Sequence, residues 1–94
     1  MSEDKSIERV LAERGQRYGK FTHHAEVTQT LKALFRSKLG AKWEHLADDQ
    51  KEALEMIAHK LGRILNGDPN YADSWTDIAG YARLVADRLD GAER

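Results

Sequence analysis

Apolar residues recur every three or four positions in separate stretches of this chain, and this spacing constrains the fold more than any other feature. The clearest stretch is 49–66, where six apolar residues fall on one side of a helical wheel drawn at about 100° per residue. They are Leu54, Ile57, Ala58, Leu61, Ile64 and Leu65. No stretch shows the alternation of a β-strand. The spacing therefore predicts an all-α protein.

Glycine and proline divide the chain into four predicted helices. The first is expected at 3–13 and ends before a segment that contains Gly15 and Gly19. The main helices are expected at 22–39, 49–66 and 74–90, and Gly40 and Gly67 follow two of them as C-terminal stops. The 94 residues then form a single helical domain, 1–94, arranged as a compact bundle of about four helices. Small α domains often complete their core by association, so we expect a homo-oligomer.

The charge balance and the absence of cysteine exclude several classes of protein. The chain has 15 Lys and Arg against 16 Asp and Glu, and this near balance argues against general nucleic-acid binding. There is no Cys, so disulfides and thiolate metal sites are excluded. No apolar run approaches the roughly 20 residues that a membrane span needs. The first residues lack the apolar core of a signal peptide, so a cytoplasmic location is expected.

The helix at 49–66 also has a polar face opposite its apolar side. Glu52, Glu55, His59 and Arg63 lie on this face. One interpretation is a solvated surface with ion pairs one helical turn apart. The other is a groove formed with another helix or another subunit, into which Lys60 could reach while its aliphatic stem stays buried.

The start of the helix at 74–90 combines acidic and aromatic residues. Asp73 and Asp77 are one turn apart, so both carboxylates could contact one divalent cation. Alternatively, Ser74 and Asp77 form a capping box, and acidic residues suit the N-terminus of a helix. Gly80, inside this helix next to Tyr81, costs roughly 1 kcal/mol relative to Ala, which suggests that a ligand or a helix packs against the backbone there.

The two glycines near the start lie among basic residues. Arg14, Arg17 and Lys20, with Tyr18, could bind a phosphate, or the segment could be a simple connector.

Histidine offers no recognised metal site. His23 and His24 are adjacent and point about 100° apart on a helix, and His45 and His59 have no partner at a ligand spacing.

Three motifs give the chain a family resemblance. They are Arg17-Tyr18-Gly19, the run from Ala53 to Arg63, and Asp73-Ser-Trp-Thr-Asp77-Ile-Ala-Gly-Tyr81. Together they resemble a family of small phage and prophage proteins of unknown function, over roughly residues 14 to 88. This resemblance implies a location in the cytoplasm of a bacterial host cell.

A more distant similarity is to the all-α nucleotide pyrophosphohydrolases of the MazG and dimeric dUTPase type. Glu52-Ala-Leu-Glu55 resembles their first acidic motif, and Asp77 the aspartate of the second. The acid expected three residues before Asp77 is replaced by Ser74, with Asp73 one place away. The resemblance implies Mg²⁺ as cofactor, held by Glu52, Glu55, Asp73 and Asp77.

Three functions follow as hypotheses, and whether the protein is an enzyme stays open. The first is binding of a nucleotide or another phosphate-bearing ligand at the junction of the helices at 49–66 and 74–90, in a degenerate MazG-like fold. The second is Mg²⁺-dependent hydrolysis of nucleoside triphosphates. The third is a regulator or inhibitor that binds a host protein. The expected ligand-binding residues are Lys60, Arg63, Arg17, Tyr18, Trp75 and Tyr81.

Overall fold

The computed structural model describes residues 2–37 and 40–92, and all regular structure in these ranges is helical. The five helices are α1 (Ser2–Tyr18), α2 (Phe21–Arg36), α3 (Gly40–Glu44), α4 (Asp48–Asn66) and α5 (Ala72–Leu89). The prediction of an all-α fold is confirmed for the described residues. Among them, no helix combines the length and the hydrophobicity that crossing a membrane requires.

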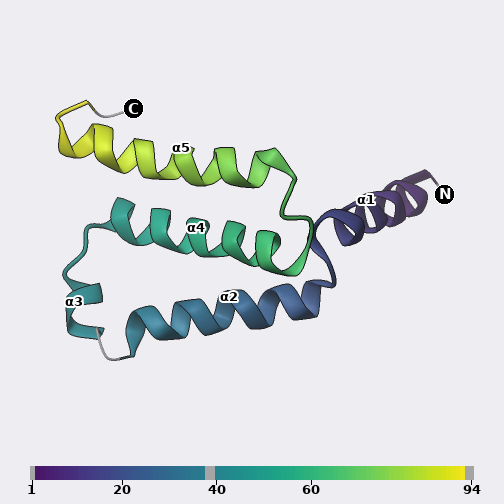
Figure 1. Ribbon diagram of the computed structural model, residues 1–94, viewed down its shortest axis with the longest axis horizontal. Helices are drawn as coiled ribbons and strands as arrows, with labels where there is room; N and C mark the ends of the chain where they lie inside the picture. The colour runs from purple at the N-terminus through teal and green to yellow at the C-terminus, as the bar shows by residue number, and fades with distance from the viewer. Residues whose placement is uncertain (1, 38–39, 93–94) are drawn as a thin grey trace.

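The three long helices α2, α4 and α5 lie side by side in one layer (Figure 1). Helix α4 occupies the middle and packs against α2 on one side and α5 on the other. Helix α1 leaves this layer at one end, so the molecule measures 47 × 32 × 27 Å along its principal axes. The arrangement is therefore a single layer with an arm, rather than the compact bundle that the sequence suggested.

The first helix is longer than predicted. It continues past residue 13 and through Gly15 to Tyr18. An added Cβ at Gly15 would meet no atom within 4 Å, so this glycine fits a helix as an ordinary small residue. The chain turns at Gly19 instead, where φ is +78°, a left-handed conformation that favours glycine.

The segment between α2 and α4 contains a short helix that the sequence analysis treated as a linker. Gly40, expected to stop the preceding helix, is the first residue of α3, while α2 ends at Arg36. The predicted end of that helix, at residues 38 and 39, lies outside the described residues. Trp43 anchors α3, because its buried ring stacks on Phe35 of α2 with centroids 5.1 Å apart.

The N-terminus of α4 is capped by the side chain of Gln50. Ala47 is the N-cap residue, and its backbone N–H donates to the side-chain oxygen of Gln50 at 2.8 Å. Asp48 and Asp49 lie within the first turn. Their negative charges there interact favourably with the positive end of the helix dipole. The predicted end of this helix at Asn66, with Gly67 as the C-cap, is confirmed.

The capping box expected at Ser74 is absent. Helix α5 begins at Ala72, after the N-cap residue Tyr71, so Ser74 and Asp77 both lie inside it. Ser74 is only 3% exposed, and Asp77 forms an ion pair with Lys60 instead of reaching back to the cap.

The core of the layer is thin. The buried hydrophobic residues are Trp43, Ala53, Ala58 and Ile64, and no large side chain in the described part of the chain is fully buried. Among the described residues, α4 has a helix on each side, and α1 contacts it at one end, so much of the apolar surface of the layer stays exposed.

Candidate functional site

The turn between α1 and α2 packs directly against the turn between α4 and α5. The side-chain amide of Asn66 donates to the backbone carbonyls of Tyr18, at 3.0 Å, and of Lys20, at 2.9 Å. The backbone N–H of Asp68 donates to the carbonyl of Arg17. Residues about 48 positions apart are therefore joined through backbone groups.

This contact requires glycine on both sides. A Cβ at Gly19 would lie 2.2 Å from the carbonyl oxygen of Asn66, and a Cβ at Gly67 would lie 2.1 Å from that of Arg17. Both distances are too short for any side chain. The Arg17-Tyr18-Gly19 motif and the Asn66-Gly67 pair thus form one tertiary junction.

Aromatic rings and guanidinium groups cover the junction. The guanidinium of Arg63 lies 4.1 Å from the ring centroid of Tyr18, and that of Arg17 lies 4.6 Å from Tyr71. The two tyrosine rings meet edge to face at 6.2 Å. Tyr71 also donates its hydroxyl hydrogen to Asp73 at 2.8 Å, and this bond is the main reason that the pKa of Tyr71 is raised.

Next to the junction, two histidines meet between α2 and α4. Nε2 of His24 lies 3.3 Å from Nδ1 of His59, and the rings cross at 82°. One nitrogen must donate and the other accept, so the two rings cannot both be protonated in this arrangement. Burial, followed by the positive charge of Arg63, lowers the pKa of His59 to about 4. Burial also lowers the pKa of His24.

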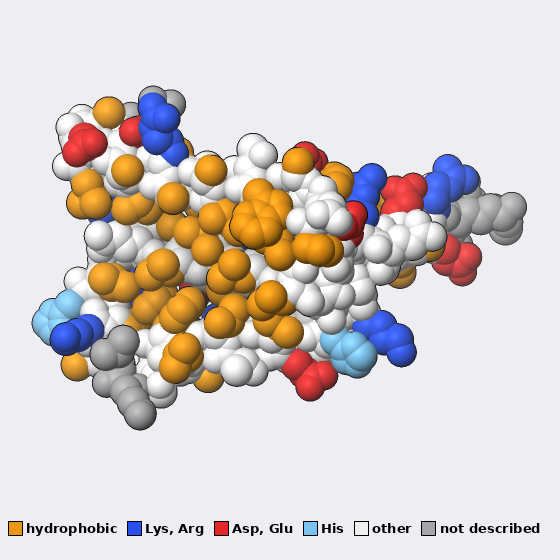
Figure 2. All heavy atoms as spheres, in the orientation of Figure 1, with side chains coloured by type: hydrophobic (Ala, Val, Ile, Leu, Met, Phe, Trp, Pro, Cys, Tyr) orange, Lys and Arg blue, Asp and Glu red, His pale blue; other side chains and the backbone are white. Residues whose placement is uncertain are grey.

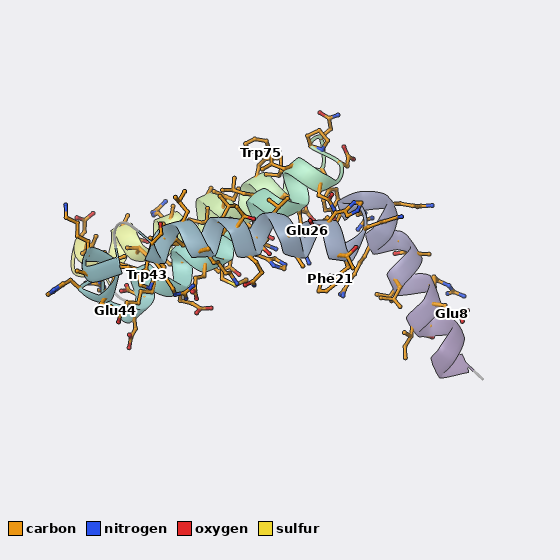
Figure 3. All side chains as sticks on the ribbon, turned by 90° about the horizontal axis from the view of Figure 1, so that it is seen from below. Glu8, Phe21, Glu26, Trp43, Glu44 and Trp75 are labelled. Atoms are coloured by element: carbon orange, nitrogen blue, oxygen red, sulfur yellow. The ribbon has the colours of Figure 1, made fainter. Side chains whose placement is uncertain are left out.

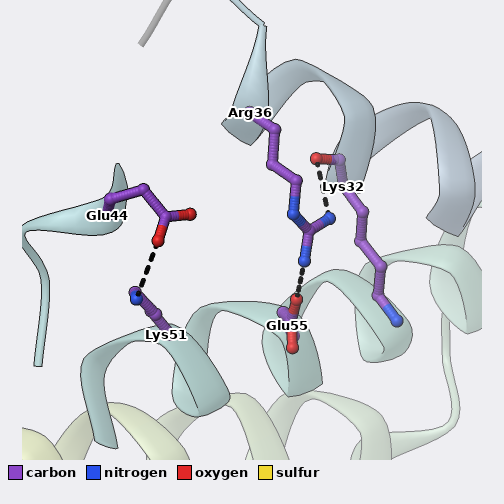
Figure 4. Close-up of polar contacts among 5 residues, drawn as sticks. All are labelled: Lys32, Arg36, Glu44, Lys51 and Glu55. Carbon is purple, nitrogen blue, oxygen red and sulfur yellow. Dashed lines mark hydrogen bonds and ion pairs between the residues drawn. The ribbon is translucent and has the colours of Figure 1, made fainter. Parts of the chain in front are cut away.

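Part of the polar face of α4 is consequently an interface with α2. Besides the histidine pair, Glu55 accepts from the guanidinium of Arg36 at 2.6 Å (Figure 4). The same view shows Lys51 of α4 paired with Glu44 of α3 at 3.7 Å. Of the two interpretations of this face, contact with another helix is supported over a fully solvated surface.

A hollow of about 650 Å³ opens where α1, α2 and α4 meet. Among the described residues, three cationic side chains line it, together with both histidines and several apolar groups, and no carboxylate does. We call it the basic hollow; its side chains are Leu11, Arg14, Tyr18, Lys20, Phe21, His24, His59 and Arg63. Within the described part of the chain, its three cations form no ion pair.

The structure divides the predicted ligand-binding residues between different surfaces. Arg63 and Tyr18 line the basic hollow, and Arg17 lies beside it at the junction. Lys60 points to the opposite side of α4, where its ammonium group pairs with Asp77 at 2.9 Å.

The two predicted aromatic residues of α5 also lie away from the basic hollow. The indole N–H of Trp75 donates to the carbonyl of Pro69. Figure 3 places Trp75 on one side of the helix layer and Phe21 on the other. Tyr81 lines a separate hollow between α4 and α5. Gly80 has open space where a Cβ would lie, so no other described helix packs closely against it, and it lines a hollow together with Tyr81 and Leu84.

The four carboxylates expected to bind Mg²⁺ do not form a common site. Glu55 pairs with Arg36, Asp77 pairs with Lys60, and Asp73 accepts from Tyr71. Glu52 lines the hollow that contains Tyr81. In the described ranges, no three histidine or acidic side chains lie close enough together to hold a metal ion. The residues therefore do not fit the MazG-type cation site.

Several residues of the site could not be inferred from linear spacing. His24 and His59 are 35 positions apart, and Gly62 lets them approach, because a Cβ there would lie 2.9 Å from Nδ1 of His24. Asn66 was regarded only as the end of a helix. A usable signal was the coincidence of a glycine and a histidine on the polar face of α4, which is unusual for a solvated surface.

Fold and site together describe a small all-α protein with a basic hollow between three helices. The chain belongs to the DUF6378 family, a domain of unknown function that matches residues 4–89. The expectation of an uncharacterised family is thereby confirmed. No curated protein and no solved structure matches the chain.

Proposed function

We propose that this protein binds a phosphate-bearing small molecule, of nucleotide type, in the basic hollow. The observation that carries the proposal is the lining of that hollow, whose described residues include three cations and no carboxylate. An anionic group there meets Arg14, Lys20 and Arg63 without competing with an internal ion pair among the described residues. Guanidinium groups suit phosphate because they donate two parallel hydrogen bonds.

The hollow also provides for a second, less polar part of the ligand. Phe21 and Leu11 line it and are 76% and 61% exposed, respectively. An exposed aromatic ring beside cations is suited to stacking on a nucleobase. The ring of Tyr18 supports Arg63 from behind, which limits the entropy that the arginine loses when it binds an anion.

This proposal moves the ligand site from the α4–α5 junction to the other side of α4. The similarity to phage and prophage proteins suggests the cytoplasm of a bacterial host cell as the setting, and we propose that the protein acts there as a homo-oligomer. The proposal concerns binding and assigns no hydrolysis, because the expected Mg²⁺ ligands are engaged separately.

The test is a thermal-shift and calorimetric screen with nucleoside triphosphates, nucleoside monophosphates, unphosphorylated nucleosides and inorganic pyrophosphate, each with and without Mg²⁺. We expect phosphorylated nucleotides to raise the melting temperature more than nucleosides do. Arg63→Gln should weaken binding by roughly tenfold or more, because a hydrogen bond to a charged group is worth about 1.5–3 kcal/mol.

Arg83→Gln is the matched control, since Arg83 is an exposed arginine on α5 that is paired with Asp87. It should leave the affinity unchanged. Equal losses in both variants, or no response to any phosphate-bearing compound, would contradict the proposal. Pyrophosphate release assayed in the same samples would separate binding from the hydrolase alternative.

A further inference from the structure

One face of the helix layer is strongly apolar. Figure 2 shows hydrophobic side chains gathered over α2, α4 and α5 on this face, and Figure 3 places Trp75 on the same side. We call it the apolar face. At about 100° per residue, it contains the leucines of α2 and α4 that point away from Phe21 and Arg63 and the leucine of α5 within about 40° of Trp75. Its residues are Leu34, Leu54, Leu61, Leu65, Trp75 and Leu89. Leu65 is 71% exposed and Leu34 is 62% exposed, values that are unusual for large aliphatic side chains grouped together.

No described part of the chain covers this face. The layer is one helix thick, and helical domains normally bury their apolar stripes between two layers. Helix α1 does not supply the second layer, because it leaves toward the side of Phe21, opposite to Trp75 (Figure 3). The few buried hydrophobic residues imply that the layer alone is weakly stabilised.

The face is suited to a second copy of the same chain. The charges that border it on α4 are already neutralised internally, Glu55 by Arg36 and Lys60 by Asp77. When two copies meet through this face, apolar side chains of one copy therefore contact those of the other, and the charges on α4 that border the face bring no unpaired like charges together. If the fold needs a partner on this face, that partner must be present wherever the chain is present. A second copy of the same chain always is.

The size of the face is also appropriate. Helix α4 has 19 residues, so it is about 28 Å long at a rise of about 1.5 Å per residue. Three helices at the usual interaxial distances make the layer roughly 25 Å wide. The resulting footprint of about 700 Å² is close to the roughly 800 Å² per partner of a stable interface.

We propose that the apolar face packs against the same face of a second copy, with α4 lying on α4 across a two-fold axis. Such an interface is isologous, so each residue near the axis meets its own counterpart. It gives the homo-oligomer of the proposed function a definite surface. It does not involve the basic hollow, whose Phe21 lies on the other side of the layer.

The first test is the mass of the full chain in solution, measured by light scattering over a range of micromolar concentrations. We expect a mass twice the 10.7 kDa of the chain. Leu34→Glu and Leu65→Glu should each reduce it to the mass of one chain at the lower concentrations. Both side chains are exposed in the single chain, so neither change enters its core. Circular dichroism should show that each variant stays helical.

Leu84→Glu is the control. Leu84 is 50% exposed, and it lies nine residues after Trp75, which places it on the opposite side of α5 at about 100° per residue. This variant should remain a dimer. Arg63→Gln should also remain a dimer while it loses the ligand, which separates a failure of this inference from a failure of the proposed ligand site.

The second test uses the absence of cysteine in the chain. Leu61→Cys should form an intermolecular disulfide under mild oxidation, because α4 faces α4, whereas Leu84→Cys should not. A chain that is monomeric at every concentration would overturn the inference and leave the face to a different protein. A dimer that survives both glutamate variants, or that crosslinks through position 84 rather than 61, would overturn it as well.

Discussion

At Gly62, the lack of a side chain determines how closely α2 and α4 approach each other. A Cβ at this position would lie 2.6 Å from Cγ2 of Thr28 and 2.9 Å from Nδ1 of His24. Both of those residues are buried at 5% exposure. The glycine thus costs helix propensity but lets the histidine pair form. Gly15, in contrast, has open space around it, and nothing in the described structure requires glycine there.

We therefore predict opposite effects for two glycine-to-alanine changes. Gly62→Ala should lower the free energy of unfolding by about 1–3 kcal/mol, because the added methyl group overpacks the α2–α4 contact. Gly15→Ala should leave the free energy of unfolding unchanged or raise it by up to about 1 kcal/mol, because alanine has the higher helix propensity. Urea denaturation monitored by circular dichroism measures both.

Thr28→Ser removes the methyl group nearest to the added Cβ. It should restore part of the stability of Gly62→Ala when the two changes are combined. If Gly62→Ala were as stable as the unmodified chain, the close approach of α2 and α4 would be disproved.

At the scale of elements, the turn that follows α1 ties this helix to the layer. The side chain of Asn66 donates hydrogen bonds there to the backbone carbonyls of Tyr18 and Lys20. Ile7, Val10 and Leu11, farther toward the N-terminus, are all exposed. The basic hollow lies between α1 and the layer, so the docking of this helix also determines the shape of the proposed ligand site.

Asn66→Ala should release α1 without unfolding the layer. It removes two hydrogen bonds to backbone carbonyls, each worth about 0.5–1.5 kcal/mol. We expect faster amide hydrogen exchange in α1 but not in α4 or α5, together with weaker binding of phosphorylated nucleotides. Asn70→Ala, which changes an exposed asparagine of the neighbouring turn, is the matched control. Unchanged exchange in α1 would show that other contacts hold it.

At the scale of the whole molecule, the layer relies on few buried hydrophobic groups and on specific polar contacts between helices. The guanidinium of Arg88 donates two hydrogen bonds, of 2.8 and 2.6 Å, to the carboxylate of Asp49. They link the first turn of α4 to the last turn of α5. The histidine pair links α2 to α4 on the other side. The stability of the whole fold should consequently respond to pH where these histidines titrate.

The free energy of unfolding should fall as the pH is lowered from about 6.5 toward 4. An unfolded histidine takes up its proton near pH 6.5, whereas folded His59 does so only near pH 4. Between these values the unfolded chain binds more protons, so acid favours unfolding. The stabilisation is complete above pH 6.5, and the lowered pKa of His24 acts in the same direction.

Melting temperatures measured between pH 7.5 and 4.5 test this pH dependence. His59→Gln should flatten the curve through this range, whereas His23→Gln, a change at an exposed histidine of α2, should leave its shape unchanged. An unmodified chain whose melting temperature does not change between pH 7 and 5 would contradict the assignment of a neutral histidine pair.

The sequence by itself determined the helical class and most helix boundaries, because spacing of apolar residues and turn chemistry at Gly67 and Pro69 act over only a few residues. It also indicated that Arg17, Tyr18 and Arg63 belong to unusual motifs. It did not indicate that α1 runs through Gly15, because a single glycine costs a helix only about 1 kcal/mol and does not by itself end it.

The tertiary structure alone decided which sides of the helices meet. Lys60 and Arg63 are one helical turn apart on α4, which lies between two neighbouring helices. Lys60 therefore pairs with Asp77 of α5, whereas Arg63 lines the basic hollow on the other side. The pairing of His24 with His59 depends on Gly62 and on a separation of 35 residues, over which local spacing carries no information. For the same reason, helical periodicity marked the apolar side of α4, but only the tertiary structure showed that Ala58 and Ile64 on this side are buried while Leu54 and Leu65 stay exposed.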